Sequence, residues 1–113
     1  EQSFTDRPKP DEKDPIAVWN RGFGTFLEAV NNTPQVVVAA VEGYAIAGGF
    51  GILCVSDVAI CTEGAGFAMS ETAIGIVPAQ IAPFVAARIG VPQTRHLTLT
   101  AARFKGPEAL RLG

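Results

Sequence analysis

A chain of 113 residues is long enough for one domain, or for part of a larger one. Apolar side chains make up 48% of the residues and charged side chains 18%, which is enough to bury a core and excludes disorder throughout. The formal net charge is −2, and no run of basic residues alternates with aromatic ones, so a nucleic-acid-binding surface is not expected.

Residues 1–14 are rich in charge and proline, and we predict a mobile arm or loop there, ahead of a domain over 15–113. Asp14 and Pro15 are typical of a helix start, with aspartate as the N-cap and proline at the first helical position. The sequence NNTP at 31–34 is expected to end this helix. The helix carries an apolar face at helical spacing, formed by Trp19, Phe23, Phe26, Leu27 and Val30.

The run VVVAAV at residues 36–41 lacks alternation and is typical of a strand buried on both faces. A turn rich in glycine follows at 43–51, which we call the glycine turn. Further along the chain the patterns predict a short helix, a second buried strand, a third short strand, a brief helical turn containing Glu71, two helices, an extended segment and a last helix. The predicted helices span 50–55, 80–89, 92–100 and the residues from 107 onward, and the brief helical turn spans 70–74. The predicted strands span 58–60 and 67–69, and the extended segment spans 102–104. This order indicates an α/β protein of coiled ββα units rather than a doubly wound sheet.

The two cysteines, Cys54 and Cys61, stand seven positions apart and form no CxxC pair. We therefore expect reduced thiols in a cytoplasmic protein, without a disulfide framework or a metal site. Residues 36–55 form a stretch long enough to cross a bilayer, with Glu42 as its single charge. Glu42, the glycines and nearby Asp57 favour a buried strand and a turn instead, so no membrane span is predicted.

The glycine turn reads GYAIAGGFG and contains neither GxGxxG nor GK[ST], so it indicates neither a dinucleotide site nor a phosphate loop. Small residues after a buried strand let main-chain amides approach a ligand, and such amides can hold negative charge that develops on oxygen. Glu71 is the lone carboxylate that could then move a proton. The alternative is plain packing of the glycines, with Glu71 as a surface charge, and His96 is expected on a helix surface.

The stretch over residues 36–78 resembles the central motif of the crotonase superfamily, the enoyl-CoA hydratases and isomerases. In that family a buried strand precedes G-x-A-x-G-G-G, followed by a C-D-x-x-x-A strand and then F-x-x-P-E-x-x-x-G-x-x-P. The tail RHLTLTAARFKGPEALRLG is similar to the family's LTG-x-x-x-x-A-x-E-A-x-x-x-G segment. The matching positions are Gly43, Ala45, Gly48, Gly49, Asp57, Phe67, Glu71, Gly75 and Pro78. The resemblance covers roughly residues 15–113 and implies a partial crotonase-like domain, the central portion of the family's fold.

By this resemblance, Gly48 and Glu71 are the catalytic residues. Gly48 would donate its main-chain N–H to the thioester oxygen of the substrate, where enolate charge develops. Glu71 would move a proton at the α or the neighbouring carbon. The residues implied to contact substrate are Ala45, Gly49, Gly51, Pro78 and Gln80. The implied partner is an acyl-CoA thioester, with no separate cofactor because coenzyme A is part of the substrate, and the implied assembly is a homo-oligomer, a trimer or hexamer.

Two departures from the family pattern indicate which members of the family this sequence resembles most. Gly51 stands where two-carboxylate hydratases have a glutamate, and PAQIAPFV replaces a glycine-rich P-G-x-G-G-T-Q segment. The segments GGFG at 48–51 and IVPAQIAPFVAARIG at 76–90 together most resemble hydratases of branched glutaconyl-CoA thioesters, such as isohexenylglutaconyl-CoA and methylglutaconyl-CoA. We hypothesise that Gly51 leaves space for a branch or a second carboxylate, and that Gln80 reaches the same pocket through a hydrogen bond.

Three functions follow from the sequence. The first is hydration of a 2,3-unsaturated acyl-CoA, the second is isomerisation of an enoyl-CoA double bond by Glu71 alone, and the third is a non-catalytic acyl-CoA-binding or assembly fragment. Family members are longer than this chain, which begins at Glu1 without methionine or a signal-peptide pattern. We therefore expect a piece of a longer protein, with impaired activity when isolated, because the loop with a second oxyanion amide and the helices of the trimer contact would lie outside it.

Overall fold

The computed structural model describes residues 9–113. The first part of the predicted arm, residues 1–8, lies outside the described residues. Residues 9–13 form an exposed turn that leads into the first helix.

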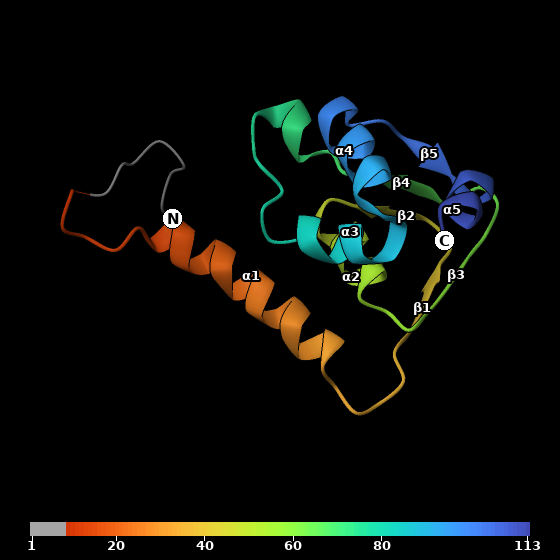
Figure 1. Ribbon diagram of the computed structural model, residues 1–113, viewed down its shortest axis with the longest axis horizontal. Coiled ribbons are helices and arrows are strands. Elements are labelled where there is room, and N and C mark those ends of the chain that lie inside the picture. The colour runs from red at the N-terminus through yellow and green to blue at the C-terminus, as the bar shows by residue number, and fades with distance from the viewer. Residues whose placement is uncertain (1–8) are drawn as a thin grey trace.

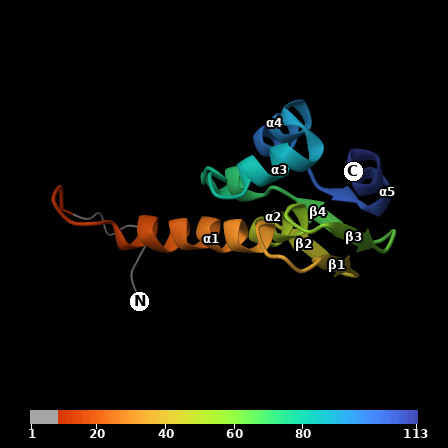
Figure 2. The ribbon, with the colours of Figure 1, turned by 60° about the horizontal axis from the view of Figure 1, so that its bottom comes forward.

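Helix α1 (Pro15–Asn31) begins and ends where its sequence predicts. The side chain of Asp14 accepts a hydrogen bond from the main-chain N–H of Ile16 at 2.9 Å, which satisfies one of the free amides of the first turn. Asn32 follows the last turn, and its N–H donates to the carbonyl of Glu28 at 3.0 Å. The helix extends away from the rest of the molecule (Figures 1 and 2).

The predicted apolar face of α1 is only partly covered. Leu27 is fully buried, while Phe23 and Val30 are half-buried against the core. Trp19 and Phe26 are exposed, Trp19 to 74%. The helix therefore contacts the body through its C-terminal half, while its N-terminal half extends away from the body (Figure 2).

Within residues 9–113, five short strands form two small sheets. Strands β1 and β3 pair in parallel, with Val38 opposite Val58, and strands β2 and β4 pair in parallel, with Tyr44 opposite Gly66. Strand β5 adds to β4 in the antiparallel direction, so the second sheet has the order β2-β4-β5. The bounds of the strands are β1 Val38–Val41, β2 Tyr44–Ile46, β3 Val58–Cys61, β4 Gly66–Ala68 and β5 Phe104–Lys105.

This pairing confirms the expected coiled ββα arrangement. The chain makes two strands and a helix, and the next two strands then lie on the first two in the same direction, β3 on β1 and β4 on β2. Strand β2 was not predicted, because it lies inside the glycine turn, where three residues offer too short a pattern to recognise.

The helices after β2 agree with the predicted ones to within a few residues, and Figure 2 shows α3, α4 and α5 on one side of the sheets. Pro83 lies in the first turn of α3, where proline removes no helical hydrogen bond. Gly90 ends α3 with φ of 86°, a left-handed conformation that glycine adopts without strain. The bounds are α2 Gly48–Cys54, the 3₁₀ turn η1 Glu71–Ile74, α3 Ala82–Ile89, α4 Val91–Thr100 and α5 Gly106–Leu112.

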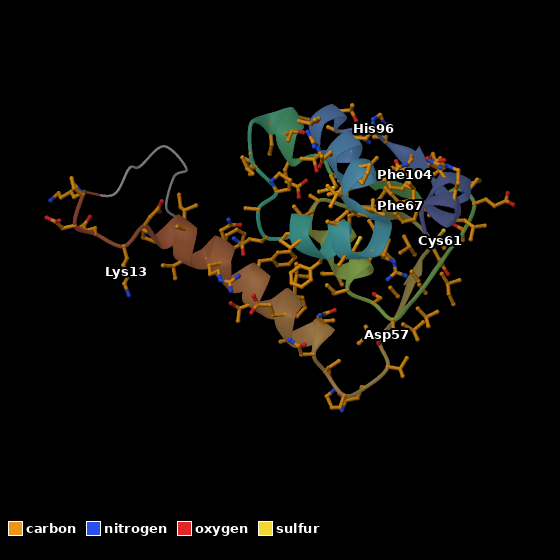
Figure 3. All side chains as sticks on the ribbon, in the orientation of Figure 1. Lys13, Asp57, Cys61, Phe67, His96 and Phe104 are labelled. Carbon is orange, nitrogen blue, oxygen red and sulfur yellow. The ribbon has the colours of Figure 1, made fainter. Side chains whose placement is uncertain are left out.

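The core lies between α2, α3 and the sheet that contains β4. The rings of Phe67 and Phe104 stack with centroids 5.5 Å apart, and Phe50 meets Phe104 edge to face at 5.8 Å (Figure 3). The largest fully buried side chains are Phe67, Leu27, Met69 and Val85. Strand β4 is buried along its whole length.

The prediction that 36–41 and 58–60 are buried on both faces is wrong for the described residues. Val38 of β1 is 57% exposed and Ile60 of β3 is 58% exposed. A run of apolar β-branched residues predicts a strand, but which elements cover its faces depends on tertiary neighbours. In the part of the chain that the structure describes, β1 and β3 have only each other as strand partners.

Among residues 9–113, no helix has the length and hydropathy that a bilayer crossing requires.

Candidate active site

The parallel pairing of β2 and β4 brings Gly48 and Glu71 to the same edge of the sheet. Ile46 and Ala68 are opposite each other at the carboxyl ends of the two strands. Gly48 begins α2 just beyond Ile46, and Glu71 begins η1 just beyond Ala68. Because the strands run in the same direction, both residues emerge at one edge, which is where α/β proteins commonly bind ligands.

The main-chain N–H of Gly48 belongs to the first turn of α2. The first bond back to the start of this helix is donated by Gly51 to the carbonyl of Ala47, at 3.1 Å. The amides of residues 48–50 therefore have no carbonyl partner within the helix, as is usual at a helix start, and no side chain caps them. These three N–H groups are hydrogen-bond donors at the N-terminal end of the helix.

A strained residue sets the direction of this helix start. Ala47 has φ 53° and ψ −120°, a left-handed conformation that is uncommon for any residue other than glycine. Its N–H donates to the carbonyl of Ala68 at 3.0 Å, which fixes Ala47 to β4. Together with the Gly51 bond, this contact holds the Ala47–Gly48 peptide from both sides.

The surroundings of the glycines in the turn differ from one residue to the next. A Cβ built on Gly48 would lie 3.1 Å from Cζ of Phe23, so the ring from α1 covers that side of Gly48. A Cβ built on Gly49 would have nothing within 4 Å, so the space beside Gly49 is open. Gly49 is also exposed, which leaves room next to the Gly48 amide.

The side chain of Glu71 carries an unpaired polar atom. Its Oε2 is buried and has no hydrogen-bond partner among the described residues. A buried carboxylate oxygen without a partner is destabilising, and such atoms in folded proteins usually have a functional explanation or bind water or an ion. The main-chain carbonyl of Glu71 accepts from the N–H of Ile76 at 3.0 Å, which closes the turn locally.

The space expected beside Gly51 is filled. Gly51 is buried, and a Cβ built on it would lie 2.5 Å from Cγ2 of Ile81 and 3.5 Å from Cδ1 of Leu27. The absent side chain thus allows α2 to approach the segment before α3, and Ile81 occupies the volume that we had expected to be free for a substrate branch. A substrate contact by Gly51 stays a prediction.

The structure directs Gln80 toward α1. Its Oε1 lies against Gly24 and accepts from Nη1 of Arg21 at 3.5 Å, while Arg21 also pairs with Glu28 at 2.9 Å. Pro78 is buried in the loop before α3. The contacts of Gln80 and Pro78 with substrate stay predictions.

Ala45 is a core residue in the middle of β2, with Phe67 opposite it. Its side chain packs inward, so a contact of Ala45 with substrate would involve its main chain. Asp57, another position of the family motif, is structural: its Oδ2 accepts from the N–H of Val37 at 2.8 Å and joins the start of β3 to the segment before β1 (Figure 3).

The remaining residues singled out in the sequence lie away from this edge. His96 is exposed on α4, as expected (Figure 3). Cys54 and Cys61 are both free thiols, and burial raises the pKa of Cys54 to about 12, partly opposed by the positive charge of Arg88. Within residues 9–113, no group of His, Cys, Asp and Glu side chains is arranged to hold a metal ion.

A cavity of about 530 Å³ lies between α2, β3 and α5, and its walls are mainly apolar, including Phe50, Phe67 and Phe104. Neither Gly48 nor Glu71 lines it. We therefore place the candidate site at the edge of the sheet where Gly48 and Glu71 lie, and not in this cavity.

Sequence reasoning missed three residues that lie against the glycine turn or within it: Phe23, Ala47 and Ile81. Phe23 was expected only as part of an apolar face. The others carry no local signal, because their roles arise from contacts across the fold.

Comparison with known proteins identifies the family of this chain. The sequence pattern described as enoyl-CoA hydratase/isomerase matches residues 9–113. The carnitinyl-CoA dehydratase of Escherichia coli strain K12 is 34% identical over 100 residues, which is 88% of this chain and 38% of that protein. This chain thus spans 38% of the length of that curated relative.

Solved structures have the same fold. AtuE of Pseudomonas aeruginosa is 56% identical with a TM-score of 0.87, over 90% of this chain and 40% of that one. An enoyl-CoA hydratase/isomerase from Marinobacter aquaeolei is 45% identical with a TM-score of 0.89, over 96% of this chain and 41% of that one. These matches confirm the crotonase-like fold, present here in part, and the chain belongs to the enoyl-CoA hydratase/isomerase family of the crotonase superfamily.

Proposed function

We propose that the native protein carrying this sequence adds water to a 2,3-unsaturated acyl-CoA thioester. The observation that carries the proposal is the unpaired, buried Oε2 of Glu71 at the same edge of the sheet as the free amide of Gly48. A carboxylate and an amide donor at one edge are the two groups that this reaction needs.

In the proposed reaction, Glu71 accepts a proton from a water molecule as the water oxygen bonds to C3 of the substrate. The electron pair of the C2–C3 double bond moves toward the thioester carbonyl, whose oxygen becomes the enolate oxygen. The N–H of Gly48 donates to that oxygen and stabilises the charge. The enolate then takes the proton from Glu71 at C2, the carbonyl reforms, and Glu71 returns to its starting state.

A relative supports a reaction that adds or removes water at a CoA thioester. It is a carnitinyl-CoA dehydratase, and removal of water from a CoA thioester is the reverse of the proposed hydration. We propose a branched or carboxylated acyl chain, of the glutaconyl-CoA type, on the resemblance of residues 48–51 and 76–90 to hydratases of such substrates. The open space beside Gly49, rather than the filled space beside Gly51, is where we expect the branch to fit.

A second candidate is isomerisation of an enoyl-CoA double bond. The observation in its favour is that Gly51 supplies no second carboxylate and Ile81 fills the space beside it, so that Glu71 is the acid on which the reaction would depend. One base that moves one proton between carbons is sufficient for an isomerase. The isomerase leaves no solvent oxygen in the product, and the hydratase leaves one.

The test uses the native protein with crotonyl-CoA and a branched glutaconyl-CoA in ¹⁸O-labelled water. Hydration predicts loss of the enoyl absorbance and one labelled oxygen in the product, and Glu71→Gln should lower kcat by at least roughly a hundredfold. Unlabelled product with a shifted double bond would establish the isomerase instead. Binding of coenzyme A without turnover would favour the non-catalytic acyl-CoA-binding fragment.

We also propose a cytoplasmic homo-oligomer, a trimer or hexamer, as in the family. The two free thiols agree with a reducing compartment, and exposed apolar side chains such as Trp19 and Val38 agree with surfaces that further protein covers. Light scattering of the native protein measures the oligomer directly, and a monomer would contradict this part of the proposal.

A further inference from the structure

Helix α4 holds the turn that carries Glu71. The hydroxyl of Thr72 donates to the main-chain carbonyl of Thr98 at 2.6 Å, across 26 positions of sequence. The hydroxyl of Thr98 in turn contacts Sδ of Met69 at 3.5 Å. One residue of α4 is thus joined to the chain on both sides of Glu71, at Met69 before it and at Thr72 after it.

The hydrogen bond from Thr72 provides a donor for the main-chain carbonyl of Thr98. Thr98 lies in the last turn of α4, where main-chain carbonyls have no partner further along the helix. The Thr72 hydroxyl supplies a donor to this carbonyl in a partly buried position. Its loss would leave the carbonyl without that partner, so the contact is worth more than an exposed one.

The turn itself has little to hold it. Turn η1 has four residues and 3₁₀ geometry, which is poorer in hydrogen bonding than an α-helix. Ser70, at its start, makes no side-chain capping bond, and none of the residues of η1 is fully buried. A short turn of this kind takes its orientation from outside contacts, and the one from Thr72 to α4 is adjacent to Glu71.

We propose that Thr72, with Thr98 as its acceptor, is a positioning residue for Glu71. This inference rests on the proposed acid–base role of Glu71. The Thr72–Thr98 bond fixes the start of η1 against α4, and it thereby restricts the orientations of the Glu71 carboxylate at the edge of the sheet that also carries the amide of Gly48. A small displacement of a catalytic group lowers the rate far more than it lowers binding.

The test compares three variants of the native protein with crotonyl-CoA. Thr72→Val removes the hydroxyl and keeps the shape, and it should lower kcat roughly ten- to a hundredfold while KM changes by less than about threefold. Thr72→Ser keeps the hydroxyl and should restore most of kcat. Thr94→Val is the matched control, because Thr94 is on the same helix and its hydroxyl donates to the carbonyl of Gly90 at 2.8 Å, without any bond to η1.

The variant Glu71→Gln, alone and combined with Thr72→Val, separates this inference from the proposed function. If Thr72 acts through Glu71, adding Thr72→Val to Glu71→Gln should lower kcat by less than about twofold further. Full activity of Glu71→Gln would refute the proposed function itself. A large loss in Glu71→Gln, together with equal kcat for Thr72→Val and Thr94→Val, would leave the function standing and overturn the positioning role.

Discussion

Cγ2 of Ile81 lies where the first side-chain atom of any larger residue at position 51 would have to be. A Cβ built on Gly51 comes within 2.5 Å of Cγ2 and 2.9 Å of Cβ of Ile81. Both residues are buried, and they join α2 to the segment that begins α3. Glycine at 51 and isoleucine at 81 are therefore one packing unit, in which an apolar side chain occupies the volume that a larger residue at 51 would need.

This relationship predicts that Gly51→Ala lowers the free energy of unfolding by about 1–3 kcal/mol, because the new methyl group overpacks against Ile81. Adding Ile81→Ala should recover part of that loss, which urea unfolding of both single variants and the double variant would reveal as a coupling. Gly49→Ala is the control on the same helix, and with open space around it the substitution should be neutral or slightly stabilising. Equal stability of Gly51→Ala and Gly49→Ala would contradict the packing argument.

The strained helix start predicts a strong effect of side-chain branching at Ala47. Ala47→Val should destabilise the protein by about 2 kcal/mol, because a β-branched residue fits poorly at φ 53°. Ala40→Val, on the exposed part of strand β1, should have little effect, because valine favours extended backbone. Thermal unfolding of the two variants compares them directly, and a similar melting temperature would count against strain at Ala47.

The buried thiol of Cys54 predicts a loss of stability at alkaline pH. Its pKa is raised from 9.0 to about 12 by burial, so below pH 9.0 the thiol is protonated in both the folded and the unfolded state and its contribution is complete. Between pH 9.0 and about 12 the unfolded thiol ionises while the folded one does not. The unfolded state then binds fewer protons, and the free energy of unfolding falls as the pH rises, by at most about 1.4 kcal/mol per pH unit.

Urea unfolding of the wild type and of Cys54→Ala, from about pH 8 to about pH 11, isolates this contribution from that of other alkaline groups. The difference between the two proteins should shrink as the pH rises. Cys61→Ala controls for the loss of a thiol, since Cys61 is only half-buried. A constant difference for Cys54→Ala over this range would show that the thiol titrates alike in both states.

The N-cap hydrogen bond of α1 predicts that its removal destabilises the first turn of that helix. Asp14→Ala removes the bond to the N–H of Ile16 and should cost about 1 kcal/mol of helix stability. Hydrogen exchange of the first amides of α1 should accelerate, because this end of the helix extends away from the body (Figure 2). Asp11→Ala, in the exposed turn before the helix, should leave those exchange rates unchanged, and an equal acceleration in both variants would rule out the cap.

Much of the local structure could be predicted from the sequence because it depends on neighbours in the chain. The aspartate–proline pair defines the start of α1, and the glycine at 90 ends α3, through bonds and backbone angles within a few residues. Strand β2 was missed, because a strand of three residues has too little pattern of its own and forms only by pairing with β4. The exposure of Val38 and Ile60 was missed for a related reason, since burial depends on what lies against the strand.

The sequence by itself determined the candidate groups of the site, a carboxylate at Glu71 and a glycine-rich helix start at Gly48. Side-chain chemistry and motif spacing are properties of the sequence and do not depend on the fold. Only the tertiary structure decided that these groups share an edge, that Ile81 fills the space beside Gly51, and that Thr72 is tied to α4. Each of those facts arises from contacts between residues far apart in sequence, and such contacts are fixed by the packing of the whole core and not by any local pattern.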